Sequence, residues 1–147
     1  CLIDSESNPV NLHMDKIFFT YRFEKLEVYQ LARRFRVDIK KLTLKFPSDE
    51  KFELTSQIRR SSSSIATNLA EGSGRASSSD QAHFSNIAFS SALETIDHLI
   101  YALDMDYISE DIYTELRLKL DEIINKINSL YKYQIGQLES LKNKLRK

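Results

Sequence analysis

The sequence predicts an all-α fold, an antiparallel up-down four-helix bundle with a disordered or extended N-terminal leader. The 147 residues include only three Gly and two Pro, which leaves little material for the turns of a β-rich fold. Apolar residues recur at helical spacings along four stretches, and no strand pattern competes with them. A hydrophobic content of 41% with 29% charged residues is typical of a globular domain.

The first helix is expected where apolar side chains between residues 28 and 46 share one helical face. Pro47 is expected to end it, because proline has no N–H to donate and disfavours helical geometry in the preceding residue. The apolar face consists of Val28, Leu31, Phe35, Ile39, Leu42 and Phe46.

The second helix is expected to begin at Ser48-Asp49-Glu50, which offers an N-terminal cap and acidic residues for the first turn. Gly72 and Gly74 are expected to end it with a left-handed C-terminal cap. The four serines at 61–64 fall inside its periodic frame, so their small side chains predict close approach of another helix. A phosphorylated or catalytic serine is the alternative interpretation.

The third and fourth helices are expected to begin near Ser77-Ser78-Ser79-Asp80 and at Ser109, which again supply cap residues. The fourth helix carries a heptad-like apolar seam that is interrupted at Gln134 and Gly136. We therefore expect its last part to extend beyond the bundle as a frayed or kinked tail. The seam consists of Leu116, Leu120, Ile123, Ile127, Leu130, Gln134, Leu138, Leu141 and Leu145.

These stretches divide the chain into a leader or arm (1–21), a bundle (22–134) and a helical or frayed tail (135–147). Residues 1–13 are polar and irregular, and Met14 opens a segment typical of a translation start. We interpret 1–13 as upstream sequence or a leader; a lipid-modified Cys1 is the alternative. The apolar run at residues 17–19 predicts an arm. No stretch approaches the roughly 18 apolar residues of a membrane span.

Charge is distributed unevenly along a chain whose net charge is zero. Residues 22–45 carry eight basic and three acidic side chains, a balance of +5. Residues 77–113 carry seven acidic side chains and no Lys or Arg, a balance of −7, and residues 114–147 have a balance of +4. Two helices are therefore basic and one is acidic.

Two interpretations of this pattern remain open. In one, the acidic helix faces basic helices of its own chain or of a neighbour, and the charges set their register. In the other, basic side chains contact nucleic-acid phosphates, although overall neutrality argues against a high-affinity binder. The candidate phosphate contacts are Arg33, Arg34, Arg36, Lys40 and Lys41 on the first helix and Arg59, Arg60 and Arg75 on or after the second.

Polar residues at set positions distinguish the second helix from a generic bundle helix. Gln57, Asn68 and Glu71 fall close to one helical face. We expect structural roles for them, because buried polar groups must be paired and such pairs fix register. In this interpretation Arg60 and Glu71 form a polar pair, and Asn68 satisfies a neighbouring backbone group or a subunit contact.

The segments FEKLEVYQLARRF (23–35) and LTSQIRR…SIATNLAEGSGR (54–75) resemble the four-helix-bundle family encoded by intervening sequences in bacterial 23S rRNA genes, also labelled ribosomal protein S23. The resemblance covers roughly residues 20–133; Tyr29 stands where the family often has Trp. It implies a cytoplasmic ring, typically a homopentamer, with no established enzymatic activity. A related bundle of diversity-generating retroelements engages reverse transcriptase and RNA, which favours nucleic-acid binding by analogy.

The residues that catalysis would need are missing from the sequence pattern. His83 and His98 lie about 22 Å apart if they share one helix, so they cannot hold one metal ion. The single Cys excludes a cysteine zinc site, and Gly72-Ser73-Gly74 has neither the preceding strand nor the following Lys of a phosphate-binding loop. We expect no enzyme, no cofactor and no metal.

The sequence thus supports two hypotheses. The first is a non-enzymatic, ring-forming bundle, an oligomer of identical chains, that binds RNA or DNA through basic residues of its first two helices. The alternative is a scaffold or adaptor ring that docks a protein partner without binding nucleic acid.

Overall fold

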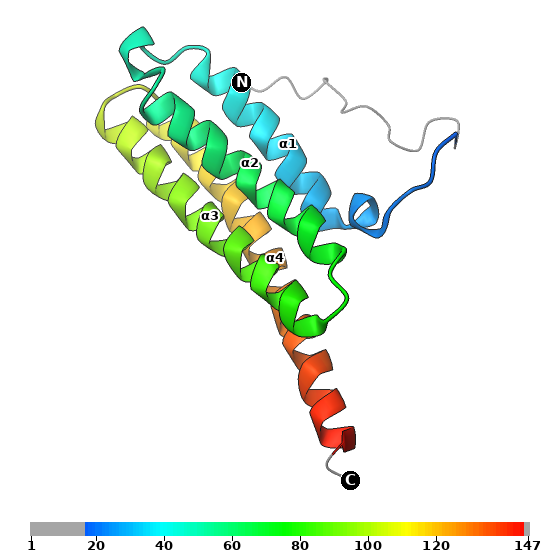
Figure 1. Ribbon diagram of the computed structural model, residues 1–147. Coiled ribbons are helices and arrows are strands. Elements are labelled where there is room, and N and C mark those ends of the chain that lie inside the picture. Colours follow the sequence, from blue (N-terminus) through cyan, green and yellow to red (C-terminus); the bar gives the residue numbers. More distant parts are fainter. Residues whose placement is uncertain (1–16, 146–147) are drawn as a thin grey trace.

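The computed structural model describes residues 17–145, with the side chains of 138–142 and 145 left undescribed. Consecutive long helices lie side by side and run in opposite directions (Figure 1). The predicted all-α, four-helix fold is confirmed, and residues 17–145 contain no strand. The elements are η2 (Arg22–Lys25), α1 (Glu27–Thr43), η3 (Ser48–Glu50), α2 (Leu54–Ser73), α3 (Ser78–Asp104) and α4 (Glu110–Leu145).

Helix α1 buries the apolar face that its spacing predicts. Phe35 and Ile39 are almost completely enclosed, and Ala32 fills the position between successive large side chains. The helix ends at Thr43, ahead of Pro47, and Phe46 still reaches the core from the connection.

The expected start of the second helix at Ser48-Asp49-Glu50 is wrong by several residues. These residues form the 3₁₀ helix η3, and α2 begins only at Leu54. Glu50 supplies the cap from outside the helix, because its Oε2 accepts a hydrogen bond of 3.2 Å from Leu54 N–H. Its Oε1 accepts a second bond of 3.1 Å from the Tyr107 hydroxyl, which ties this connection to the one between α3 and α4.

The expected left-handed glycine cap at the end of α2 is also wrong. Gly74 has a φ of −87°, and no described glycine has a positive φ; the left-handed residue is Asp106, with a φ of 58°. Gly72 is needed for a different reason. A Cβ on Gly72 would lie 2.7 Å from the Phe84 Cβ, so its absence lets α3 approach α2 closely.

The serine-rich part of α2 packs against α3, as the small side chains predict. Ser61 and Ser62 are buried. Thr95 Oγ1 lies 2.8 Å from Ser61 Oγ, and Ser64 Oγ lies 2.8 Å from Ser91 Oγ. Because each buried hydroxyl has a partner, the two helices meet through paired polar groups.

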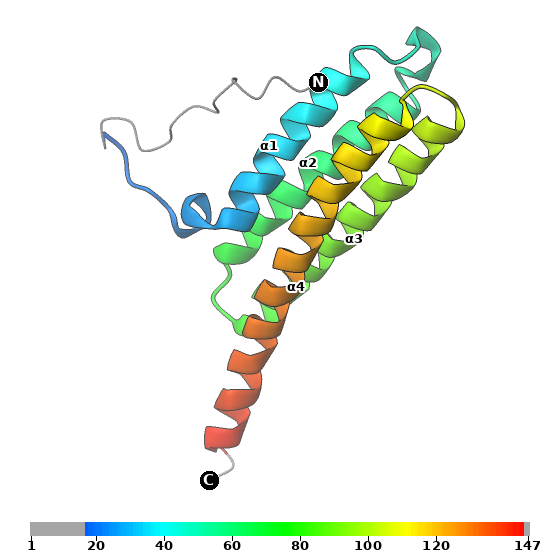
Figure 2. The ribbon, with the colours of Figure 1, turned by 180° about the vertical axis from the view of Figure 1, so that it is seen from behind.

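The predicted caps of α3 and α4 are confirmed. Ser77 Oγ accepts from Asp80 N–H, and Ser109 Oγ accepts from Ile112 N–H. Helix α4 continues through Gly136 and extends past the other helices (Figure 2).

The seam of α4 is buried as far as it is described. The predicted side chains at Leu138, Leu141 and Leu145 fall among the undescribed ones. The buried members of the seam are Leu116, Leu120, Ile123, Ile127 and Gln134, with Leu130 partly buried.

The residues before η2 form a non-helical arm. Ile17, Phe18 and Phe19 are exposed, and the described part of the chain has no helix of the length and apolarity that a bilayer crossing requires. The predicted leader 1–13 lies outside the described residues.

Candidate nucleic-acid interface

A row of basic side chains follows the side of α1 that faces α2. The bond from Arg59 Nε to Thr43 Oγ1, 2.7 Å long, identifies this side of α1. Because each residue of an α-helix is rotated by about 100° from the last, Arg33, Arg36 and Lys40 share this side and point further toward solvent. We call Arg33, Arg36, Lys40 and Arg59 the basic strip. Lys40 is exposed, and the three arginines are half-buried.

The other two candidates on α1 lie on its opposite edge. Arg34 and Lys41 share the side of α1 that faces α4, where Asp38 accepts a hydrogen bond of 3.2 Å from Lys119 Nζ. The five basic residues predicted on the first helix are therefore divided between two edges, and only three of them join Arg59.

The edge of α1 that faces α4 is held by ion pairs. Between the helices, Lys119 Nζ pairs with Asp38 and Lys126 Nζ lies 3.4 Å from Glu27 Oε2, while within α4 Lys119 Nζ also lies 3.9 Å from Glu115 Oε1. Burial raises the pKa of Asp38 above its ordinary value of 3.8, and this outweighs the opposing effect of Lys119. The acidic residues of α1 thus lie on the α4 edge, away from the basic strip.

Replacing Asp38 with asparagine is expected to flatten part of the pH dependence of stability. The folded state holds the Asp38 proton more tightly than the unfolded chain, so between pH 3.8 and the raised folded pKa the free energy of unfolding falls as pH rises. Asp38→Asn removes this decline. Urea unfolding of both proteins from below pH 3.8 to neutrality measures it, and parallel curves for the two proteins would contradict the expectation.

The remaining arginine candidates lie apart from the strip. Arg60 is exposed on the outer face of α2, while Arg75 follows the end of this helix. The Arg75 guanidinium carbon lies 4.5 Å from the ring centroid of Phe84, a cation–π contact. Since α2 separates Arg59 from Arg75 by about 20 Å, Arg75 does not share a site with the strip.

The expected polar pair between Arg60 and Glu71 is wrong. The two residues are about 16 Å apart along α2, and both are exposed. Gln57 is exposed as well. Asn68 Nδ2 donates to the Ser64 carbonyl at 2.8 Å and to Ser64 Oγ at 2.9 Å, so its amide joins the hydroxyl network between α2 and α3.

The expectation that the acidic helix faces basic helices of its own chain is not met by the ion pairs. Among the described side chains, the ion pairs between helices join the two basic helices, and in each pair an acidic residue of α1 meets a lysine of α4. On α3, Glu94 Oε1 lies 3.4 Å from His98 Nε2 of the same helix. The carboxylates at Asp97 and Asp104 are exposed, which leaves the charge of α3 facing outward.

The sequence patterns do not single out Thr43, although it positions Arg59. Its hydroxyl donates to the Ile39 and Lys40 carbonyls and accepts from Arg59. The only sequence signal is a polar, β-branched residue in the last turn of the first helix, and that signal is too common to be specific. Where the structure describes side chains (17–137, 143 and 144), no three His, Cys, Asp or Glu residues gather as metal ligands.

Comparisons with known proteins agree with the fold. Residues 24–129 match the family model described as 23S rRNA-intervening sequence protein. A solved protein from Bacteroides thetaiotaomicron VPI-5482, described as a protein with unknown function from the S23 ribosomal protein family, is 29% identical with a TM-score of 0.67. The match covers 71% of this chain and 95% of that one. The comparison with curated proteins gives no match. The resemblance predicted from residues 23–35 and 54–75 is confirmed.

Proposed function

Because the chain belongs to the 23S rRNA-intervening sequence protein family, we propose that it is a non-enzymatic, cytoplasmic bundle that assembles with copies of itself and binds RNA or DNA through the basic strip. The observation that carries the proposal is the strip itself. Arg33, Arg36, Lys40 and Arg59 line one side of the α1–α2 pair, and the acidic residues of α1 lie on the other edge.

The size of the basic strip suits a few phosphates of one strand. Arg33 and Lys40 are separated by about 10 Å along α1, which spans two to three phosphates at roughly 3.4 Å of rise each. Contact with that number of phosphates predicts a salt slope of about −2 to −3 on logarithmic axes. Binding is therefore expected to be weak at physiological salt and to be easily measured at low salt.

Reversing two charges of the strip is expected to weaken nucleic-acid binding by about tenfold or more at low salt. Arg36→Glu with Lys40→Glu removes two phosphate contacts and adds repulsion. Fluorescence anisotropy with structured RNA and with duplex DNA, at low and moderate salt, measures the change. Lys132→Glu with Lys144→Glu is the matched control, because both lysines are exposed on α4 and the net charge changes equally.

Equal binding by the strip variant and the control would contradict the proposal, and so would an absence of binding by the unmodified protein at low salt. The second result would favour the alternative function, an adaptor ring that docks a protein partner. The exposed apolar arm is the observation that favours this alternative, because Ile17 and Phe19 are 84% and 75% exposed and have no role in the bundle core.

Self-assembly is supported by the outer face of α3. Leu93 and Ile100, two turns apart, are 48% and 40% exposed, and partly buried Phe89 and Ile96 border them. The helix carries exposed acidic side chains and no Lys or Arg, so it complements the basic outer face of α1 in a neighbouring copy. The resemblance implies a ring of five. Light scattering on the anisotropy samples tests assembly, and a stable monomer would contradict it.

A further inference from the structure

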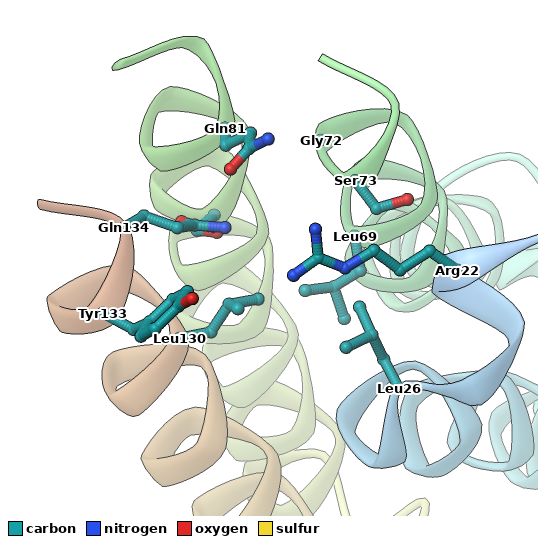
Figure 3. Close-up of a pocket in the computed structure, with 10 residues that line it drawn as sticks. Arg22, Leu26, Leu69, Gly72, Ser73, Gln81, Leu130, Tyr133 and Gln134 are labelled. Carbon is teal, nitrogen blue, oxygen red and sulfur yellow. The ribbon is translucent and has the colours of Figure 1, made fainter. Parts of the chain in front are cut away.

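A small pocket lies at the end of the bundle far from η3, and none of the residues that line it belongs to the basic strip. It lies where η2, the C-terminal end of α2, the first turns of α3 and the middle of α4 come together (Figure 3). Leu26, Leu69 and Leu130 form its apolar wall, and its polar lining comes from different elements. The polar and small lining residues are Arg22, Gly72, Ser73, Gln81, Ser85, Tyr133 and Gln134.

Gln134 presents a hydrogen-bond donor to this pocket. Gln134 is only 6% exposed. It continues the seam of α4 after the apolar residues Ile127 and Leu130. Its Oε1 faces the buried Ser85 hydroxyl and accepts a hydrogen bond of 2.7 Å from it. The Gln134 Nε2 is therefore the atom left to donate, and Figure 3 shows it directed across the cavity. No residue described by the structure accepts from it.

Arg22 reaches the same cavity from the opposite side. Its side chain extends from η2 so that the guanidinium faces Gln134 across the gap (Figure 3). Among the side chains that the structure describes, no Asp or Glu lines the pocket and none forms an ion pair with Arg22. An Arg fork opposite an amide donor is complementary to a planar anion with two acceptor oxygens, and a carboxylate has that geometry.

We propose that this pocket binds a short aliphatic carboxylate. Arg22 and Gln134 Nε2 donate to its two oxygens, while Leu26, Leu69 and Leu130 cover its alkyl chain. The cavity volume of about 30 Å³ has room for about two water molecules, so the pocket encloses only the carboxylate and the carbon atoms next to it. The inference is independent of the basic strip and of nucleic-acid binding.

The test is titration of the full chain with sodium butyrate at constant ionic strength, followed by NMR chemical shifts. Wild type is expected to saturate with a Kd on the order of 1 mM, as befits a six-heavy-atom ligand. Arg22→Gln is expected to weaken binding about tenfold or more, and Arg22→Lys by less, because a lysine keeps the charge without the fork. Arg60→Gln, an exposed arginine outside the pocket, is the matched control and is expected to change the affinity less than about twofold.

Two further measurements test the charge of the ligand and the amide donor of Gln134. Butyramide has the same shape without the charge and is expected to bind about tenfold more weakly. Gln134→Leu is expected to weaken butyrate binding, and because Arg22 is exposed, its variants remain informative if the Gln134 variant unfolds. Unchanged affinity in Arg22→Gln, butyramide binding equal to butyrate, inorganic phosphate binding more tightly than butyrate, or no saturation up to about 50 mM would each overturn the proposal.

Discussion

Replacing Glu50 with alanine is expected to lower the free energy of unfolding by about 2–3 kcal/mol. Glu50 is 7% exposed and satisfies two groups at once, the Leu54 N–H at the start of α2 and the Tyr107 hydroxyl. Alanine removes both acceptors and leaves the first turn of α2 without its side-chain cap. Chemical denaturation followed by circular dichroism measures the loss.

Asp49→Ala is the matched control for Glu50, since Asp49 is the adjacent acidic residue of η3 and is exposed. Its expected change is within about 0.5 kcal/mol, the usual range for surface substitutions. Tyr107→Phe removes only one of the two bonds that Glu50 accepts, so its loss is expected to be smaller than that of Glu50→Ala. Equal stabilities of the Glu50 and Asp49 variants would show that η3 contributes no cap to α2.

Replacing Gly72 with alanine is expected to destabilise the bundle by about 1–3 kcal/mol. The added Cβ would lie 2.7 Å from the Phe84 Cβ, an atom fixed directly to the α3 backbone, so the two helices must separate to admit it. This separation also strains the hydroxyl pairs that join Ser64 to Ser91 and Ser61 to Thr95. Thermal unfolding with the same optical probe measures the effect.

Gly136→Ala gives the opposite expected result at the second helical glycine. A Cβ on Gly136 would have no described atom within 4 Å apart from the neighbouring helix backbone, so alanine there adds helix propensity without a clash and stabilises by up to about 1 kcal/mol. Opposite signs at Gly72 and Gly136 would show that packing, and not backbone freedom, explains Gly72. A gain in stability at both positions would contradict the close approach of α2 and α3.

The sequence alone was sufficient to locate a helix start where the capping residue directly precedes its helix. Ser77 and Ser109 cap the helices that follow them, because a serine just before a helix places its hydroxyl within reach of the backbone N–H three residues ahead. The start of α2 could not be found this way. Its cap comes from Glu50, a side chain outside the helix, and the competing Ser48-Asp49-Glu50 signal has the same local chemistry.

In the candidate site, too, the sequence predicts some features and helix packing decides the others. The identity of the basic residues was evident from the +5 balance of residues 22–45, but their separation into two edges depends on which helix lies on each side of α1. Thr43 pairs with Arg59 of α2, while Asp38 pairs with Lys119 of α4, 81 residues away. Sequence spacing places side chains on a helical face and does not name the helix that this face will meet.

The sequence by itself determined the helices, their apolar faces, the family and the uneven charge, because helical periodicity and residue composition are local properties of a chain. The tertiary structure alone decided which of the charged side chains are grouped, why Gly72 is glycine, and that Gln134 meets Ser85 and faces Arg22 across a pocket. These contacts join residues far apart in the chain. Their energies arise only when helices pack, so no local pattern records them.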